Sequence, residues 1–354
     1  MYIVIAIIAF SLLIAVHELG HFIAAKLMGV RVNEFAIGMG PKLLKKQGKE
    51  TLYTLRALPI GGFCSMEEDE EARDSRSFTA KSRIRRVFIL AAGGIANFLA
   101  AFIIIVITVS QMSGFVGTTI TDLAEGFPNE GADGLMAGDR IVSINGERLY
   151  YGEDFSLFMQ LSGGGYVDLV VSRDGETIRL NRFPLELREY TSNGVTRLRY
   201  GLYFNLIETS VWEHLKYSCY ATMNFVRFVR ISVALLISGN AGVQDLAGPV
   251  RMVEMMNTIG QTSPSFGEAL GNIARFLALI GVNIAVVNLL PIPAMDGGRI
   301  TLLFVTWVIE KTTRRTLDPK YERYIHSAAL FLLMGLMVFI LINDVMNIVN
   351  SSNG

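Results

Sequence analysis

Two histidines near the N-terminus, His17 and His21, are separated by three residues in the sequence His-Glu-Leu-Gly-His. In an α-helix this spacing places both imidazoles on one face, about 40° apart around the axis, so they can bind the same metal ion. Glu18 lies beside them, where a carboxylate can take a proton from water bound to that ion. The motif predicts a hydrolytic zinc centre. The alternative is a helix end at a membrane surface with two unliganded histidines.

A catalytic zinc ion needs a third protein ligand and one open position. The best candidate is Asp296, in the sequence Asn-Leu-Leu-Pro-Ile-Pro-Ala-Met-Asp-Gly-Gly at residues 288–298. Pro291 and Pro293 cannot continue a regular helix, so we expect Asp296 on an irregular helix end. The alternatives are an ordinary interfacial carboxylate at this position and His326 as a substitute ligand.

The composition indicates which elements must position these residues. Of the 354 residues, 51% are hydrophobic and 18% are charged, and the mean hydropathy is +0.41. Soluble domains are about 25% charged, so the composition argues against a purely cytosolic globular enzyme. The 32 basic and 32 acidic residues give no net charge, which argues against a nucleic-acid partner. Two cysteines cannot form a Cys-rich zinc module.

Four segments are long and apolar enough to cross a bilayer, which takes about 20 residues. We expect spans at residues 1–25, 87–110, 268–297 and 324–345. A signal peptide is the alternative for the first segment, but no basic region precedes it. The sequence therefore predicts an α-helical polytopic membrane protein with four transmembrane helices.

Basic residues near the span ends predict the orientation. They are concentrated in residues 26–86 and 298–323, which we expect on the cytoplasmic side, with residues 26–86 forming membrane-associated β-hairpins. The apolar stretch 212–237 contains three basic residues and should lie along the interface. If it crossed instead, Asp296 would be a membrane thickness away from the two histidines.

The segment 111–190 has the composition of a small β-rich domain outside the cytoplasm. Short alternating runs at 140–144 and 167–171 predict strands, and Asn145-Gly146 and Asp174-Gly175 predict hairpin turns. Residues 132–146 resemble the core signature of PDZ domains, which bind an extended chain at a sheet edge. A generic β-rich domain is the alternative. Residues 191–267 would be a linker containing the interfacial helix.

Together these features resemble the site-2 intramembrane metalloproteases, and within them the bacterial regulator of sigma-E protease group with a single PDZ domain. The resemblance covers nearly the whole chain. It implies one Zn²⁺ per chain, with His17, His21 and Asp296 as ligands and Glu18 as the catalytic base. It also implies a substrate path lined by Asn97, Asn288, Pro291 and Pro293, and a strand that holds substrate, Gly61, Gly62 and Phe63.

The expected function is cleavage of transmembrane segments of single-span proteins in the bacterial cytoplasmic (inner) membrane. The family suggests anti-sigma factors and remnant signal peptides as substrates. A helical substrate must unwind before its carbonyl can be attacked, and residues 61–66 could pair with the unwound strand. The alternatives are a catalytically inactive scaffold and a metal transporter. Glu18 argues against the first, and the lack of further ionisable residues in the other spans against the second.

Overall fold

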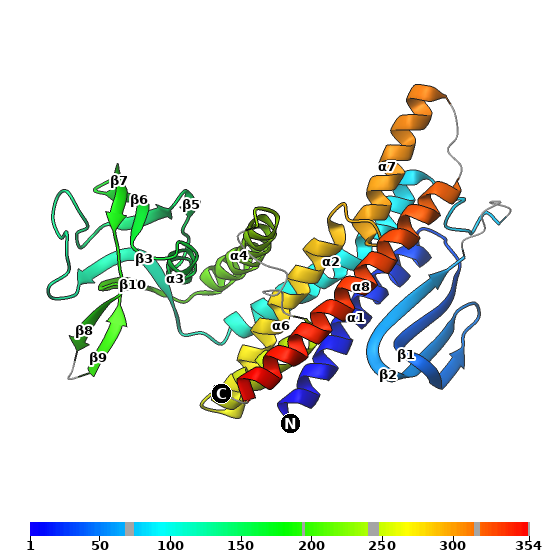
Figure 1. The fold of residues 1–354 in the computed structure, drawn as a ribbon, viewed down its shortest axis with the longest axis horizontal. Helices are drawn as coiled ribbons and strands as arrows, with labels where there is room; N and C mark the ends of the chain where they lie inside the picture. Colours follow the sequence, from blue (N-terminus) through cyan, green and yellow to red (C-terminus); the bar gives the residue numbers. More distant parts are fainter. Residues whose placement is uncertain (68–73, 193–194, 240–247, 315–318, 353–354) are drawn as a thin grey trace. The chain divides into compact units, whose positions relative to one another are not determined.

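The computed structural model describes residues 1–67, 74–192, 195–239, 248–314 and 319–352. The chain divides into two compact units, one formed by Met1–Thr108 with Ala221–Gly354 and the other by Val109–Tyr220. Figure 1 labels the helices and strands of both units. The first unit carries every residue of the expected metal centre.

Helices dominate the first unit. In chain order they are α1 (Tyr2–Leu27), α2 (Arg83–Val109), α4 (Val211–Ile237, which begins in the other unit), α5 (Pro249–Thr262), α6 (Phe266–Leu289), α7 (Asp296–Thr313) and α8 (Pro319–Ser352). Five of them are long and apolar enough to cross a membrane by length and composition: α1, α2, α4, α6 and the part of α8 from Ser327 to Asp344. The helix α4, which was expected to lie flat, is therefore also a candidate span, and the four-span count stays a prediction.

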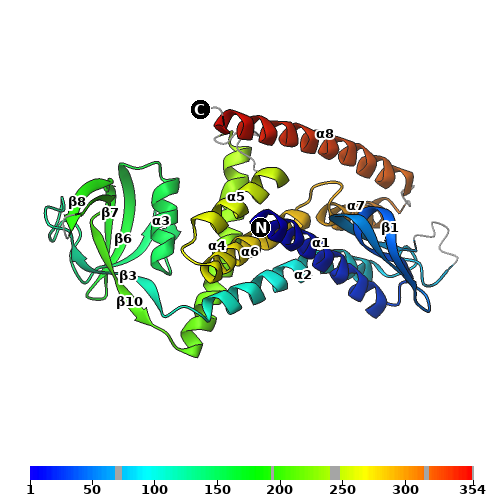
Figure 2. The ribbon, with the colours of Figure 1, turned by 90° about the horizontal axis from the view of Figure 1, so that it is seen from below.

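Helices α1 and α6 run in the same direction, as contacts along their length show. Tyr2 stacks on Phe266 near the start of both helices, and further along, a Cβ placed on Gly281 would lie 3.2 Å from the Leu13 side chain. Helix α2 runs the opposite way and packs closely on α1. A Cβ on Gly20 would lie 2.4 Å from the carbonyl oxygen of Ala92, so only glycine permits this contact. Figures 1 and 2 show the same three helices side by side.

Two features of this unit differ from the expected boundaries. The third span was expected to continue to residue 297, but α6 ends at Leu289. Residues 298–323 were expected to form a loop, but α7 occupies most of this segment as a separate helix. The prolines account for the first difference, because Pro291 and Pro293 cannot continue α6.

Near its C-terminal end, α8 is joined to α5 by a buried carboxylate. The Asp344 side chain, which is fully buried, accepts hydrogen bonds from the backbone N–H groups of Gly248 (3.2 Å) and Arg251 (3.1 Å). A carboxylate at a helix N-terminus satisfies unpaired N–H groups and interacts favourably with the helix dipole. This contact explains an acidic residue at the end of an apolar helix.

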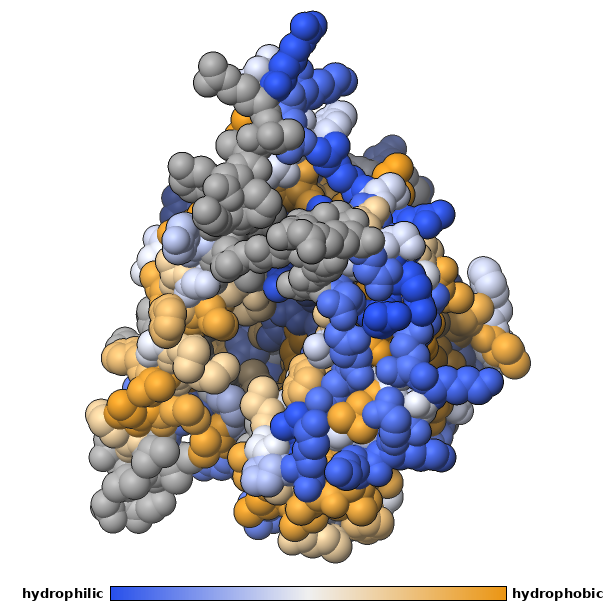
Figure 3. Space-filling view, turned by 90° about the vertical axis from the view of Figure 1, so that its right-hand side faces the viewer, coloured by the Kyte–Doolittle hydropathy of each residue, from blue (hydrophilic) through white to orange (hydrophobic). Residues whose placement is uncertain are grey.

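Between α1 and α2, the strands β1 (Val32–Gln47) and β2 (Leu52–Met66) form an antiparallel sheet with several register shifts. Phe35, for example, pairs with Cys64 and also with Tyr53. This sheet lies within residues 26–86, where hairpins are expected, and its association with the membrane stays a prediction. Figure 3 views the face that carries the sheet and α7, where hydrophilic residues gather around the end of α7.

The second unit is rich in strands: β3 (Gly114–Leu123), β4 (Arg140–Ile144), β5 (Glu147–Arg148), β6 (Tyr166–Arg173), β7 (Glu176–Pro184), β8 (Arg188–Ser192), β9 (Val195–Arg199) and β10 (Leu202–Glu208), with one helix, α3 (Gly152–Leu161). The main sheet has the order β10-β3-β4-β6-β7, with β5 beside β4. The two strands expected at 140–144 and 167–171 are confirmed as β4 and β6. The expected turns are confirmed by the positive φ of Asn145 and Asp174.

The Gly-Asp of the PDZ-like signature has a structural role in this unit. Asp139 is 1% exposed, and its carboxylate accepts two hydrogen bonds from Arg173, at 2.7 and 2.8 Å. The same guanidinium donates to the carbonyl oxygens of Ala132 and Gly134, both at 2.7 Å. A bidentate pair of this kind is geometrically specific, so it closes the loop that precedes β4. The assignment as a PDZ domain stays a prediction.

Candidate metal centre

Three side chains from two distant parts of the sequence meet between α1 and the start of α7. The Nε2 atoms of His17 and His21 are 3.2 Å apart, and each lies 3.3 Å from Oδ2 of Asp296. Within the described part of the chain, these three form the one group of His, Cys, Asp or Glu side chains that could share an ion. The structure therefore brings the predicted ligands together.

The separations suit zinc. A tetrahedral zinc ion holds nitrogen and oxygen ligands at about 2.0–2.2 Å, which places neighbouring ligand atoms about 3.3–3.6 Å apart. The observed triangle of 3.2 to 3.3 Å agrees with this to within a few tenths of an ångström. Two imidazoles and one carboxylate leave a fourth position open, as catalytic zinc sites require.

Helix α2 orients one of the imidazoles. Nδ1 of His21 is 2.9 Å from the carbonyl oxygen of Ile89. Because a carbonyl can only accept, Nδ1 carries the proton and Nε2 keeps its lone pair for a metal ion. Nδ1 of His17, in contrast, is buried without a partner among the described residues. Nothing in the sequence could have identified Ile89, because its contribution is a backbone carbonyl.

A glycine on α2 leaves the space that the imidazoles occupy. A Cβ placed on Gly93 would lie 2.4 Å from Nε2 of His21 and 2.8 Å from Nε2 of His17. Such contacts are too short for any side chain, so Gly93 is a requirement of the site. The resemblance predicts a role for Asn97, one turn further along α2, but none for Gly93.

The turn between α6 and α7 places the carboxylate. Ala294 has a φ of 76°, in the left-handed region that costs a non-glycine residue about 1–2 kcal/mol. A Cβ on Gly297 would lie 2.2 Å from the Leu290 carbonyl oxygen, and one on Gly298 would lie 2.2 Å from that of Ile292. The two glycines therefore allow the turn to fold back against itself, and Asp296 becomes the first residue of α7.

Glu18 lies between the ligands and the sheet. Its carboxylate interacts electrostatically with His17, His21 and Asp296, and it accepts a hydrogen bond from the backbone N–H of Cys64. A Cβ on Gly62 would lie 3.4 Å from Cγ of Glu18. The strand β2 thus passes directly beside the carboxylate that was predicted to act as the base.

Two asparagines lie near the ligands. Nδ2 of Asn288, at the end of α6, is 3.5 Å from Nε2 of His17. Asn97 is one helical turn beyond Gly93 on the same face of α2, since residues i and i+4 share a face. It is fully buried, and neither polar atom of its amide has a hydrogen-bond partner among the described residues. A buried amide without partners is costly, which indicates a role other than stability.

The other predicted site residues belong to the surrounding backbone. Pro291 and Pro293 are exposed and follow the end of α6. Gly61 has a φ of 86° and contacts the Met39 side chain, and the Phe63 ring lies 4.8 Å from the Arg56 guanidinium. The structure therefore places Gly61, Gly62 and Phe63 on β2 beside Glu18. The side chain of His326 lies outside the described residues.

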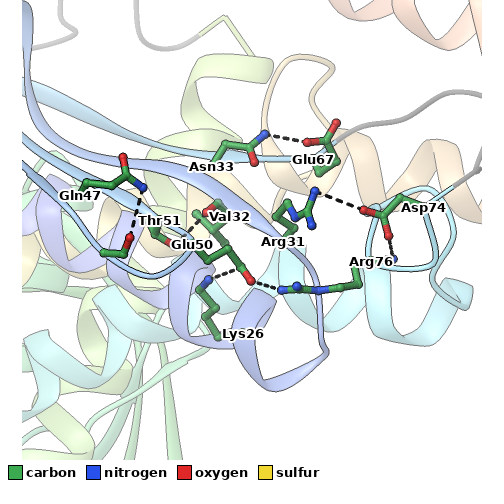
Figure 4. Close-up of polar contacts among 11 residues, drawn as sticks. Lys26, Arg31, Val32, Asn33, Gln47, Glu50, Thr51, Glu67, Asp74 and Arg76 are labelled. Atoms are coloured by element: carbon green, nitrogen blue, oxygen red, sulfur yellow. Dashed lines mark hydrogen bonds and ion pairs between the residues drawn. The ribbon is translucent and has the colours of Figure 1, made fainter.

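A polar network ties the C-terminal end of α1 to the sheet, as Figure 4 shows. Lys26 and Arg76 both donate to the carboxylate of Glu50, which precedes β2, and Lys26 does so at 2.5 Å. These hydrogen bonds lower the pKa of Glu50 from 4.5 to about 2. The network was not predicted, because its members share no recognisable spacing.

Two histidines and an aspartate with the separations that zinc requires, on helices long and apolar enough to cross a membrane, are the features of a membrane-embedded metallopeptidase. The sequence matches Peptidase family M50 over residues 5–336, so the chain belongs to this family, the site-2 proteases. It is 36% identical over 348 residues to "Putative zinc metalloprotease CPE1693" of Clostridium perfringens, covering 98% of each chain. It is also 26% identical over 426 residues to "Regulator of sigma-W protease RasP" of Bacillus subtilis, covering 96% of this chain and 97% of that one. The chain is therefore a multi-pass membrane protein and a site-2-type protease.

Proposed function

We propose that this protein is a zinc endopeptidase that cleaves transmembrane segments of single-span membrane proteins. The observation that supports this most is the triangle formed by His17, His21 and Asp296 with Glu18 beside it. The family is zinc-dependent, and the three ligand atoms have the separations that zinc requires. We assign these three residues as the zinc ligands.

When bound, zinc would act as a Lewis acid that lowers the pKa of its bound water to about 7 and polarises a peptide carbonyl. Glu18 receives the proton of the attacking water and returns it to the leaving amine. The side-chain amides of Asn97 and Asn288 are hydrogen-bond donors for the carbonyl oxygen as negative charge develops on it. The unpartnered amide of Asn97 supports this role, since a substrate would supply the missing partner.

The substrate must be extended when it reaches Glu18, because a helical segment hides each carbonyl in a hydrogen bond. The Cys64 N–H donates to Glu18, so this stretch of β2 directs backbone groups away from β1 and toward the base. Adjacent residues in a strand direct their backbone groups to opposite sides. Gly62 thus offers its N–H and C=O on the side that faces Glu18, and an unwound substrate strand can pair with them.

The metal centre lies near the cytoplasmic side of the inner membrane in this proposal. Helices α1 and α6 run in the same direction and α2 in the opposite one, so the chain crosses an even number of times between α2 and α6. The α5 helix has 14 residues and is about 21 Å long, too short to cross a core of about 30 Å. Among the described residues, α4 is then the single candidate span between α2 and α6, so an even number of crossings means that α4 does not cross. This supports an α4 that lies along the interface, with the second unit outside the cytoplasm.

The physiological substrates are proposed as a class: single-span proteins such as anti-sigma factors and remnant signal peptides. The relative named as a regulator of sigma-W protease supports a regulatory substrate of this kind. If the second unit binds an extended segment by strand addition, the segment can use the outer side of β10 or β7, or the part of β3 that β4 leaves unpaired. β3 pairs with β10 along much of its length, but with β4 only at Thr119 and Arg140.

The decisive experiment replaces the base and keeps the ligands. Glu18→Gln in the purified full chain should abolish cleavage of a single-span reporter while the zinc content stays at one ion per chain. The matched control is Glu254→Gln, a change of the same chemistry at an exposed position on α5, which should keep both properties. Cleavage retained by Glu18→Gln would contradict the mechanism. A wild-type chain that holds zinc but cleaves no reporter would favour the scaffold alternative.

A further inference from the structure

A groove lies between the N-terminal end of α2 and the outer face of α7, apart from the metal ligands. It has a volume of about 930 Å³. Its polar side is formed by Lys81, Arg83 and Arg86, and its apolar side includes Ile84, Phe304 and Trp307. Nothing in the proposed peptidase mechanism uses this groove.

The side chains that line the groove carry a net positive charge. Three of its lining residues are basic and none is acidic. Glu310 approaches from α7 and pairs with Arg83, and Lys311 lies 5.1 Å from the Trp307 ring, so the surroundings keep a positive excess. Arg83 and Arg86 stand in the first turn of α2, an apolar helix, where basic residues mark the cytoplasmic boundary of a span.

The apolar side of the groove is exposed. Ile84 is 83% exposed, Phe304 is 61% exposed and Trp307 is 39% exposed. Large side chains at such exposure are unfavourable in water but suit contact with acyl chains, and Trp is favoured at the level of lipid headgroups. The groove therefore combines basic side chains that can bind an anion with an apolar surface that can contact acyl chains, at one membrane boundary.

We propose that this groove binds an anionic phospholipid of the cytoplasmic leaflet. The basic side chains bind the lipid phosphate, and Ile84, Phe304 and Trp307 contact the upper part of the acyl chains. Basic pockets between membrane helices on the cytoplasmic side are suited to acidic headgroups. A volume of this size holds a headgroup and the first carbons of its chains, as ligand sites of about 300–1,000 Å³ do. The proposal is independent of the peptidase activity.

The test uses Trp307 as the reporter. The chain has two tryptophans, so Trp212→Phe leaves Trp307 as the single tryptophan, and its emission is followed by selective excitation of indole. The full chain is reconstituted into phosphatidylcholine vesicles that contain either brominated phosphatidylglycerol or brominated phosphatidylcholine at the same mole fraction. We expect the brominated phosphatidylglycerol to quench Trp307 several-fold more strongly, and the excess to fall in Lys81→Gln. The matched control, Lys45→Gln at an exposed position on β1, should keep the excess.

Each outcome decides the proposal. Equal quenching by the two brominated lipids, or an excess that survives in Lys81→Gln, would overturn it. If Lys81→Gln does not fold, Arg83→Gln serves instead and should reduce the excess more, because it leaves Glu310 unpaired beside the groove. Loss of the excess on adding inorganic phosphate to wild-type vesicles at constant ionic strength would show that the site takes a free anion and would also overturn the lipid assignment.

Discussion

Gly93 of α2 lies against His21 of α1 so closely that a Cβ atom at position 93 would be 2.4 Å from Nε2 of the histidine. The separation between the two helices at the metal centre is therefore set by a residue without a side chain. Helix packing and metal binding are linked at this contact, because any group added to α2 must displace the imidazoles.

The substitution Gly93→Ala tests this link. The new methyl group would push both imidazoles away from Asp296, so zinc content and cleavage should fall together, each by at least tenfold. Zinc is measured on the purified chain by atomic emission and cleavage with a single-span reporter. Gly271→Ala on α6 is the control, because a Cβ there meets no atom within 4 Å. Full zinc content in Gly93→Ala would show that the centre tolerates a wider helix separation.

Asn97 should show opposite effects on stability and activity. Replacing it with Leu removes a buried amide that has no partner among the described residues, so the free energy of unfolding should stay unchanged or rise by about 1–3 kcal/mol. Cleavage should fall by about 10²-fold or more, because a donor to the developing oxyanion is lost. Thermal unfolding in detergent and reporter cleavage measure the two properties. Unchanged cleavage would remove Asn97 from the mechanism.

The backbone N–H of Cys64 should matter more than its thiol. Cys64→Pro removes the hydrogen bond to Glu18, whereas Cys64→Ala keeps it and removes only the sulfur. We expect cleavage to be lost in the proline variant, with zinc retained, and largely kept in the alanine variant. Zinc quantification separates this effect from misfolding. Equal activity in the two variants would argue that β2 neither holds the base nor presents an edge to the substrate.

The Glu50 network should make the stability of the β1–β2 sheet depend on pH. The pKa of Glu50 in the folded chain is about 2, below its ordinary value of 4.5, so folding favours the charged carboxylate. The contribution is complete above about pH 4.5 and is lost as the pH falls toward 2. Thermal unfolding of wild type and Glu50→Gln is compared across this range. The wild type should be more stable at pH 6, and the difference should vanish near pH 2. A difference independent of pH would contradict the assignment.

Much of the site could be predicted from the sequence, because its chemistry depends on spacing. His17 and His21 share one face of any helix because they are four residues apart. The two prolines before Asp296 show where the later apolar helix, α6, must end. The structure brings all three together. The hairpin turns at Asn145 and Asp174 were predictable for the same reason, since their φ values follow from local sequence.

The remaining features depend on contacts between distant segments. The Ile89 carbonyl and the Cys64 N–H act through the backbone, which a sequence does not distinguish from any other backbone. The sequence did not predict α7, because the basic residues within 298–323 indicate a cytoplasmic loop and the segment is too polar to be a candidate span. Apolar content alone could not decide whether α4 crosses the membrane, since its length and hydropathy satisfy the same criterion as the other candidate spans.

Because Asp296 begins α7 instead of ending α6, an ion bound by the three ligands would join α1 to the first residue of α7. The two ligand segments are separated by nearly 280 residues, and closing so long a loop costs little more entropy than closing one of half that length. Leu303 of α7 already packs in an apolar cluster with Ala24 and Ala25 of α1, so the helices can assemble before the ion arrives, and the ion would then fix the start of α7 relative to α1.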